Sequence, residues 1–155
     1  MINMEDIFSV KNKVIIITGA GKGIGSMLAD ELLKRSAIVY AIDKTFPKYD
    51  EKENYFRKKC DITNKIQVEK ICKDIFKNEK KIDVLINNAG ITIPNNSSSE
   101  YSLENWKKTL DVNLTGSFLC SQIIGKILKK QHSGSIINMT SINAELGFPN
   151  NPAYV

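Results

Sequence analysis

The sequence lacks the features that mark secreted, membrane-spanning and disulfide-rich proteins. Its 3 cysteines are odd in number and form no CxxC pair, which indicates free thiols in a reducing compartment rather than a disulfide framework or a metal site. No apolar run approaches the roughly 18–20 residues that span a bilayer, and residues 1–13 contain no apolar core of a secretory signal. We therefore expect a cytoplasmic protein with no membrane partner and no metal.

Arginine is also scarce, although the chain is basic. The net charge is +5, but Arg35 and Arg57 are the only arginines, and the other basic residues are lysines spread along expected helix faces. Arginine is the preferred bidentate reader of phosphates and bases. A solvated, lysine-rich surface is therefore the favoured interpretation of the charge, and we expect no nucleic-acid partner.

The apolar content, 42%, is sufficient for one packed domain. Short runs rich in Ile and Val lie at residues 14–18, 38–42, 84–86 and 135–139. These runs are nearly continuous rather than alternating, which is typical of parallel strands that are buried on both faces. A fifth run at residues 55–60 is largely charged and predicts an edge strand.

The segments between these runs show helical spacing of apolar residues. They lie at residues 24–33, 66–76 and about 103–128. In the third segment, Trp106 and Phe118 are expected to belong to the helix core rather than to contact a ligand, and Gly134 is expected to end the helical region. Alternating strands and helices with right-handed crossovers predict an α/β fold, a Rossmann-type doubly wound parallel sheet in three αβα layers.

A glycine-rich turn follows the first expected strand and opens the first helix. Glycines permit a tight turn and a close backbone approach, and the free N–H groups and dipole of the helix favour a pyrophosphate there. A purely structural turn is the alternative, since the spacing GxxxGxG differs from the general GxGxxG fingerprint. The residues predicted to surround the pyrophosphate are Gly19, Gly21, Lys22, Gly23, Ile24 and Gly25.

An aspartate, Asp43, ends the second expected strand. A carboxylate at this place can accept hydrogen bonds from both hydroxyls of an adenosine ribose and would repel a 2′-phosphate. A loop or capping aspartate is the alternative interpretation. Lys22 and Lys44 could offer positive charge to a 2′-phosphate, but Asp43 occupies its place, so the sequence favours NAD over NADP.

Several short motifs, taken in order, resemble the short-chain dehydrogenase/reductase family. They are TGAGKGIG at residues 18–25, CDI at 60–62, NNAG at 87–90, DVN at 111–113, IINMTS at 136–141 and PAY at 152–154. The set is specific because chance would have to place every motif in sequence. The chain is identified as a member of that family, and the resemblance covers the N-terminal portion of the family's domain.

The resemblance implies roles for further cofactor-binding residues. Asp61 is expected to accept the exocyclic amine of adenine, and Ile62 to cover a face of the ring. Asn88, Ala89 and Gly90 are expected to line the cofactor ribose at the end of the fourth strand. A structural role alone, in support of the central sheet, is the open alternative for Asn87 and Asn88.

The resemblance also implies the reaction, a hydride transfer between a nicotinamide cofactor and a secondary alcohol or ketone. Tyr154 exchanges a proton with the substrate oxygen, Ser141 hydrogen-bonds the same oxygen, and Asn113 holds water in a proton relay. A tyrosine near pKa 10 needs a nearby cation to serve near neutral pH, and the family's lysine would lie beyond Val155. The alternative is a non-catalytic nucleotide-binding relative or an inactive fragment.

We expect residues 1–155 to form a single dinucleotide-binding domain that is truncated after the catalytic tyrosine. The fifth strand would then be an exposed apolar edge, and the chain alone is predicted to be poorly soluble, with negligible turnover. The full-length protein is expected to be a homodimer or homotetramer that pairs through residues 103–128. Asn143 and Glu145 favour a small, hydroxylated substrate such as a polyol or sugar acid, while an acyl thioester stays open.

Overall fold

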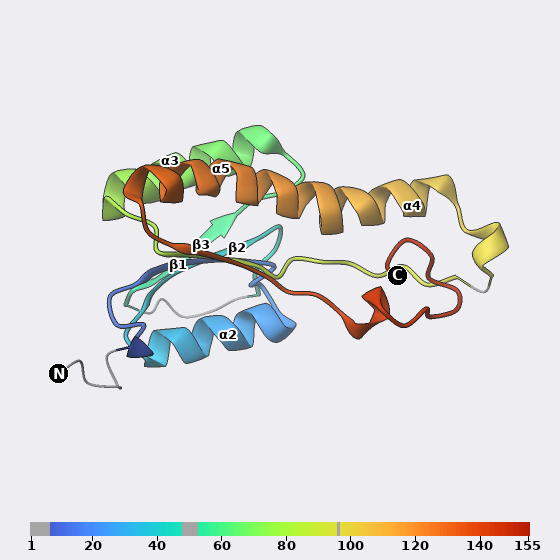
Figure 1. Cartoon of the computed structure of the whole chain (residues 1–155), viewed down its shortest axis with the longest axis horizontal. Helices are drawn as coiled ribbons and strands as arrows, with labels where there is room; N and C mark the ends of the chain where they lie inside the picture. Colours follow the sequence, from blue (N-terminus) through green and yellow to red (C-terminus); the bar gives the residue numbers. More distant parts are fainter. Residues whose placement is uncertain (1–6, 48–52, 96) are drawn as a thin grey trace.

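The computed structural model describes residues 7–47, 53–95 and 97–155, and so leaves part of the N-terminal segment considered above outside the described chain. A parallel sheet lies between helices on its two faces (Figure 1). Its strands are β1 (Val14–Thr18), β2 (Ile38–Asp43), β3 (Tyr55–Lys59), β4 (Val84–Asn87) and β5 (Ser135–Asn138), in the order β3-β2-β1-β4-β5. This order confirms the predicted Rossmann-type sheet. Strands β2 and β3 are added on one side of β1, and β4 and β5 on the other, so the order of successive strands reverses beside β1.

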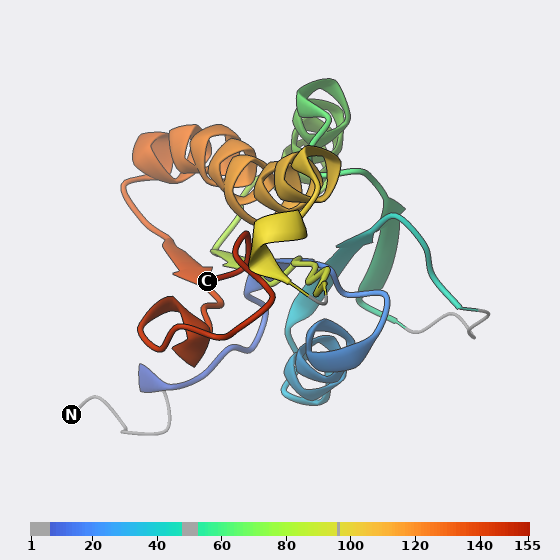
Figure 2. The same cartoon turned by 90° about the vertical axis from the view of Figure 1, so that its right-hand side faces the viewer.

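The helices cover both faces of this sheet. Helix α2 (Gly23–Lys34) packs on one face, and α3 (Lys65–Glu79) and α5 (Ser117–Gln131) pack on the other (Figures 1 and 2). Helix α4 (Leu103–Leu110) runs into α5 through a π-helical turn, η2 (Asp111–Gly116), and two short 3-10 turns, η1 (Ser98–Glu100) and η3 (Ile142–Ala144), complete the described elements.

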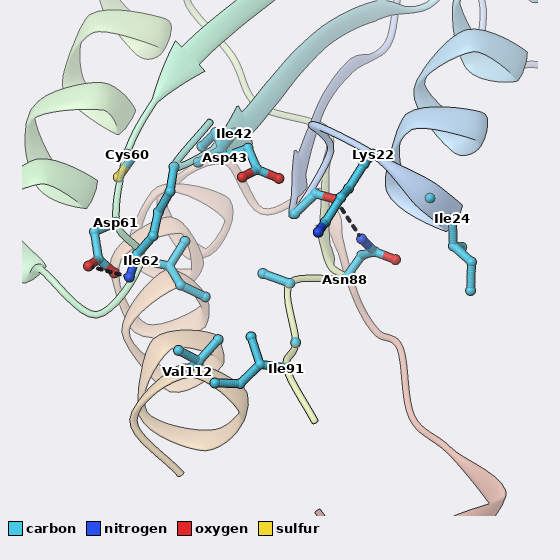
Figure 3. A pocket seen from close by; sticks show the side chains of 15 residues that line it. Lys22, Ile24, Ile42, Asp43, Cys60, Asp61, Ile62, Asn88, Ile91 and Val112 are labelled. Carbon is cyan, nitrogen blue, oxygen red and sulfur yellow. Dashed lines mark hydrogen bonds and ion pairs between the residues drawn. The ribbon is translucent and has the colours of Figure 1, made fainter. Parts of the chain in front are cut away.

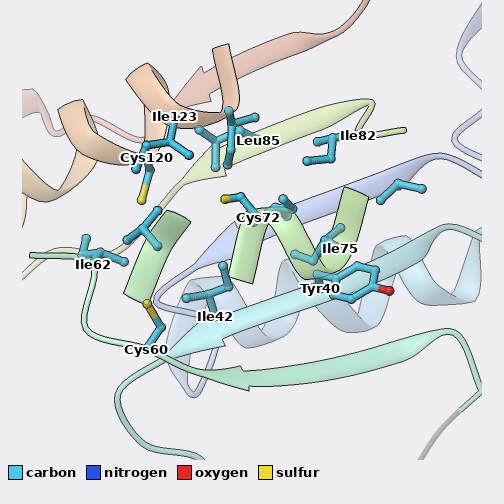
Figure 4. Packing of buried hydrophobic residues seen from close by; sticks show 14 of the residues in the cluster. Tyr40, Ile42, Cys60, Ile62, Cys72, Ile75, Ile82, Leu85, Cys120 and Ile123 are labelled. Atoms are coloured by element: carbon cyan, nitrogen blue, oxygen red, sulfur yellow. The ribbon is translucent and has the colours of Figure 1, made fainter. Parts of the chain in front are cut away.

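The central strand β1 explains why its sequence is continuously apolar. Every residue of β1 is buried, and successive side chains point to opposite faces of a strand. Val14 and Ile16 join the core below α3 and α5, shown in Figure 4, whereas Ile15 and Ile17 join the core beside α2. Two covered faces therefore require an apolar side chain at every position.

The two edges of the sheet differ in character. Strand β3 is an edge, as its charged sequence predicts. Strand β5 is the other edge, and its apolar side chains are exposed, with Ile136 at 38% and Ile137 at 47%. The expectation that this strand is buried on both faces is wrong within the described chain, while the expected apolar edge is confirmed.

The long helical segment also departs from two expectations. Trp106 and Phe118 are 39% and 57% exposed, so their assignment to the core is wrong; Cys120, Ile123 and Leu128 form the buried stripe instead. The helix ends at Gln131, with His132 in the left-handed conformation as its cap. The helix therefore ends before Gly134, the residue that was predicted to end it.

Asp83 anchors the amino ends of three strands. Its carboxylate accepts a hydrogen bond from the Val14 N–H at 2.8 Å and pairs with Lys81 at 2.9 Å, while its backbone binds Val14 and Ser135. Burial opposes ionisation, but the hydrogen bonds from Lys81 and the Val14 N–H, with the charges of Lys81 and Lys13, lower the pKa of this carboxyl below its usual range.

A lowered pKa makes the contribution of Asp83 to stability depend on pH. The contribution is present above the unfolded-state pKa of about 3.9 and is lost as the pH falls through the lower folded-state pKa. We expect Asp83→Asn to reduce the free energy of unfolding by about 1–3 kcal/mol at neutral pH, and by less in acid. Urea unfolding of both proteins at several pH values measures this, and a pH-independent difference would contradict it.

Candidate functional site

A cleft of about 430 Å³ opens where β1, β2 and β4 end (Figure 3). Its position matches the crevice at which open α/β sheets bind ligands, outside the carboxyl ends of the strands. Most of the residues predicted from the sequence to bind a cofactor line it. They are Gly19, Lys22, Gly23, Ile24, Asp43, Asp61, Ile62, Asn88, Ala89 and Gly90.

The glycine-rich turn forms the floor of the cleft. Gly19 has a positive φ of 66°, and a Cβ there would lie 2.6 Å from the Cα of Ala89. Gly23 also has a positive φ, of 59°. The turn therefore lies directly on the segment that follows β4, and it presents the N-terminus of α2, with its N–H groups, to the cleft.

Gly21 and Gly25 belong to the turn but do not line the cleft. A Cβ on Gly25 would collide with the backbone oxygen of Gly19 and lie 2.5 Å from Nδ2 of Asn88. A Cβ on Gly21 would collide with the backbone oxygen of Thr45 and with the Asp43 carboxylate. The structure thus assigns both glycines a packing role that supports the lining residues.

Asp43 is tied to this turn. Its Oδ2 accepts a hydrogen bond from the Gly21 N–H at 2.8 Å, and its Oδ1 accepts one from the Thr45 N–H at 3.2 Å. The carboxylate therefore fixes the loop after β2 in place, as the loop-aspartate interpretation predicts, and it also faces the cleft. Each oxygen can accept a further hydrogen bond.

Asp61 carries an ion pair that the sequence did not reveal. Its Oδ2 lies 2.7 Å from Nζ of Lys44, and its Oδ1 accepts hydrogen bonds from the N–H and hydroxyl of Thr63. Burial opposes ionisation, but Lys44 and Thr63 hold the pKa of this carboxyl below its ordinary value. The positive charge of Lys44 is therefore already paired at the rim of the cleft.

The two asparagines after β4 have separate partners. Asn88 donates from Nδ2 to the backbone oxygens of Thr18 and Gly19, at 3.0 and 3.2 Å, and thus holds the glycine turn. The Nδ2 of Asn87 donates to Ser121 and Asn138, each at 2.8 Å, and so joins β4 to α5 and β5. Asn87 supports the sheet, and Asn88 both supports the turn and lines the cleft.

Asn113 lies within the π-helical turn η2 and clamps the chain after β4. Its Oδ1 accepts a hydrogen bond from the Ile91 N–H at 2.8 Å, and its Nδ2 donates to the Ile91 carbonyl at 2.9 Å. Both ends of the side-chain amide are therefore engaged. Each end of the amide keeps the capacity for one further hydrogen bond.

Ser141 and Tyr154 lie in the C-terminal segment, outside the lining of the cleft. The Ser141 hydroxyl accepts a hydrogen bond from the Asn143 N–H at 3.2 Å and caps η3. The Tyr154 N–H donates to the Asn151 carbonyl at 3.1 Å. Asn151 is buried, and its Nδ2 donates to the Thr92 hydroxyl at 2.6 Å, which fastens the tyrosine segment beside the chain after β4.

The structure brings to the site several residues that were not predicted from the sequence to act there. Thr92 and Asn151 form the link described above, and only their nearness to the NNAG and PAY motifs could have suggested them. The cleft is also lined by neighbours of predicted residues, namely Ile42, Cys60, Ile91 and Val112. Each precedes or follows a predicted site residue by one position, where sequence alone does not show which way a side chain points.

Cysteines and acidic residues add no further site in the described ranges. Cys60, Cys72 and Cys120 are free and buried, and burial raises the pKa of their thiols to about 11, 12 and 12. Across residues 7–47, 53–95 and 97–155, no cluster of His, Cys, Asp and Glu side chains is arranged to hold a metal ion. Across the same ranges, no helix is both long and apolar enough to cross a membrane.

Comparison with known proteins places this geometry in a family. The family model of the short chain dehydrogenases matches residues 13–155. The chain is 33% identical over 152 residues to an NAD-dependent glycerol dehydrogenase of Listeria innocua, covering 95% of this chain and 59% of that protein. It is 35% identical over 161 residues to a probable NADP-dependent mannitol dehydrogenase of Yarrowia lipolytica, covering 93% and 55%.

A solved structure shows the same fold. The aldohexose dehydrogenase of Thermoplasma acidophilum, in ligand-free form, superposes with a TM-score of 0.86 and 32% identity, over 94% of this chain and 55% of that one. The chain thus spans between 55% and 59% of the length of these three proteins. Because the family model matches the sequence from the first strand to the last residue, the chain belongs to the short chain dehydrogenase family.

Proposed function

We propose that the protein is a nicotinamide-dependent oxidoreductase that transfers a hydride between its cofactor and a secondary alcohol or ketone. The observation that carries this proposal is the cleft at the carboxyl ends of β1, β2 and β4, where the glycine turn, the N-terminus of α2 and Asp43 meet. Three family members with related sequence or structure are named as dehydrogenases of glycerol, mannitol and aldohexose.

The lining residues fit a dinucleotide. The N-terminus of α2 offers N–H groups and the positive end of the helix dipole to a pyrophosphate, and the missing side chain of Gly19 lets the turn lie against the backbone of Ala89. Asp43 has acceptor capacity left for ribose hydroxyls. We assign Asp61 and Ile62 to the adenine end, and Asn88, Ala89 and Gly90 to the segment beside the second ribose.

We propose NAD as the preferred cofactor, although relatives use NAD or NADP. Two charges support the preference. The Asp43 carboxylate faces the cleft and would repel a 2′-phosphate. Lys44, which could otherwise attract that phosphate, lies 2.7 Å from the Asp61 carboxylate and is therefore already compensated.

Replacing Asp43 tests this preference. We expect Asp43→Asn to reduce the ratio of NADPH Kd to NADH Kd by about tenfold or more, because the repulsive charge is lost while an amide oxygen can still accept from the Gly21 N–H. Lys44→Ala is the comparison variant, and it should change the ratio less because Lys44 is paired. Titration of nucleotide fluorescence measures both. An unchanged ratio in Asp43→Asn would refute the assignment.

We propose that Tyr154 exchanges the proton with the substrate oxygen, that Ser141 hydrogen-bonds the same oxygen, and that Asn113 holds water in a proton relay. The nicotinamide supplies the hydride or accepts it when bound. The contacts that support this proposal run from Asn113 to Ile91, from Thr92 to Asn151, and from Asn151 to the Tyr154 N–H. They connect two of the three predicted catalytic residues through the chain after β4.

For the substrate, we propose a small hydroxylated compound such as a polyol or a sugar acid. The segment between Ser141 and Tyr154 carries the polar side chains Asn143 and Glu145 beside the exposed Leu146 and Phe148. The three relatives above act on glycerol, mannitol and aldohexose by name. Acyl thioester ketones are the competing class in the experiment below.

The deciding experiment follows NADH oxidation by the full-length gene product with polyol-derived ketones, keto-acids of sugars and an acyl thioester ketone. Turnover of the first two classes is expected. Binding of NADH without turnover of any ketone would instead favour a non-catalytic nucleotide-binding protein. An absence of binding to both NADH and NADPH would remove both possibilities. The free thiols support a reducing compartment, so the cytoplasm is the proposed place of this reaction.

We further propose that residues 1–155 belong to a single dinucleotide-binding domain and that the protein pairs with a second copy through α4 and α5. The support is an exposed apolar set on these helices and the turn between them. Trp106, Leu114 and Phe118 are 39%, 64% and 57% exposed. Light scattering of the full-length protein measures its mass in solution, and a monomer at all concentrations would contradict the pairing.

A further inference from the structure

The π-helical turn η2 touches the walls of the cleft at more than one place. Val112 lines the cleft directly, and Asn113 holds the Ile91 backbone. Gly116, at the other end of the turn, lies against Ile62, which lines the cleft beside Asp61. Figure 3 shows Ile62, Val112 and Ile91 on the same side of the cleft. A glycine occupies the last position of this turn.

The backbone of Gly116 does not require glycine. Its φ of −62° and ψ of −46° are ordinary right-handed helical values that any L-residue adopts. Within a helix, glycine is less favourable than alanine by about 1 kcal/mol. Helix propensity at this position therefore favours alanine, so the atoms around Gly116 must explain the glycine.

That space is filled by Ile62. A Cβ on Gly116 would lie 2.6 Å from Cδ1 and 2.7 Å from Cγ1 of Ile62, well inside van der Waals contact. Ile62 is 5% exposed and belongs to the same core cluster as Cys60, Val68 and Cys120. Core neighbours restrict its movement on that side because protein interiors are close-packed. The cleft is the open direction into which the side chain can be displaced.

We propose that Gly116 is a positioning residue for ligand binding: its missing side chain lets Ile62 withdraw from the cleft and leaves room for a flat heterocycle beside Asp61. This inference rests on the proposed dinucleotide function, and the heterocycle it concerns is the adenine ring. The turn η2 then contributes one wall directly, through Val112, and sets the position of the neighbouring side chain through Gly116.

The variant Gly116→Ala tests the proposal. Displacement of Ile62 into the cleft should weaken the binding of ADP-ribose and NADH to the full-length protein by about tenfold or more, since inserted methyl groups in packed sites are poorly tolerated. Gly125→Ala, in the adjoining helix α5, is the matched control. A Cβ there would have Ile136 Cδ1 as its near neighbour at 3.8 Å, an ordinary contact, so affinity should not change. Isothermal titration measures both.

A second pair of variants separates positioning from general damage to the fold. Ile62→Ala removes both atoms that Gly116→Ala would strike. On that background, Gly116→Ala should have no further effect on the Kd of ADP-ribose, whatever it does to the melting temperature. A full loss of affinity on both backgrounds, or an unchanged Kd in Gly116→Ala alone, overturns the proposal. Failure of the unmodified protein to bind ADP-ribose would instead overturn the dinucleotide assignment itself, and with it this inference.

Discussion

Gly25→Ala is expected to abolish measurable NADH binding to the full-length protein, with a loss of affinity of roughly a hundredfold or more, comparable with overpacking penalties at the upper end of the known range. The added Cβ would meet the backbone oxygen of Gly19 and the amide nitrogen of Asn88. Backbone cannot rotate out of the way as a flexible side chain can. The turn that forms the floor of the cleft would therefore have to lift.

Gly125→Ala is the informative comparison for this substitution. Gly125 lies outside the cleft lining, and within the described chain a Cβ there has Ile136 Cδ1 as its near neighbour at 3.8 Å, an ordinary contact. Alanine is more favourable than glycine within a helix, so this variant should retain its affinity. Equal losses in the two variants would show that sensitivity to any substitution, rather than the collision with Gly19 and Asn88, explains the effect.

Tyr154→Phe is expected to lower kcat by about 10²–10⁴, the range over which general acid–base catalysis acts. The Kd for NADH should stay within about twofold of the original value, because the lost hydroxyl acts in the transition state and not in cofactor binding. The variant removes only the phenolic hydroxyl, and the backbone bond from the Tyr154 N–H to Asn151 is kept. Single-turnover kinetics with a ketone substrate separate the chemical step from binding.

Tyr101→Phe supplies the control for this measurement. In the described part of the chain, the Tyr101 hydroxyl is buried and has no hydrogen-bond partner, so its removal should leave kcat unchanged. If Tyr154→Phe behaves like Tyr101→Phe, the proton is exchanged with another group. If Tyr154→Phe loses NADH binding as well as turnover, the tyrosine is needed for the structure of the site rather than for proton transfer.

The sheet could be predicted from the sequence because each central strand has two covered faces. The residues of β1 alternate between two cores, and this arrangement imposes the continuous apolar run that identified the strand. The same rule failed for β5, where the apolar residues Ile136 and Ile137 are exposed. An apolar strand sequence indicates that the strand is suited to burial. It does not show which helices or strands pack against it.

The cleft could be predicted in outline, since most motif residues line it, but the contacts of individual side chains could not. Asp61 was expected to bind a ligand, but no sequence pattern indicates that Lys44 pairs with it. The link between Asn151 and Thr92 joins residues far apart in the chain. Such contacts depend on rotamers and on the meeting of separate loops, which no local periodicity encodes.

The helical segment illustrates a third limit. Apolar spacing predicted one helix over residues 103–128, whereas the structure inserts the π-helical turn at residues 111–116. Apolar spacing alone does not show where such a turn is inserted. It also does not show which apolar side chains are covered, and Trp106 and Phe118 lie outside the buried stripe.

The amide clamp of Asn113 has a consequence for the chain beside the cleft. A peptide group normally offers its N–H and its carbonyl to another backbone or to water. At Ile91 one side chain accepts from the N–H and donates to the carbonyl, as a neighbouring strand would. The segment after β4 therefore needs no further backbone beside it at Ile91, which lines the cleft.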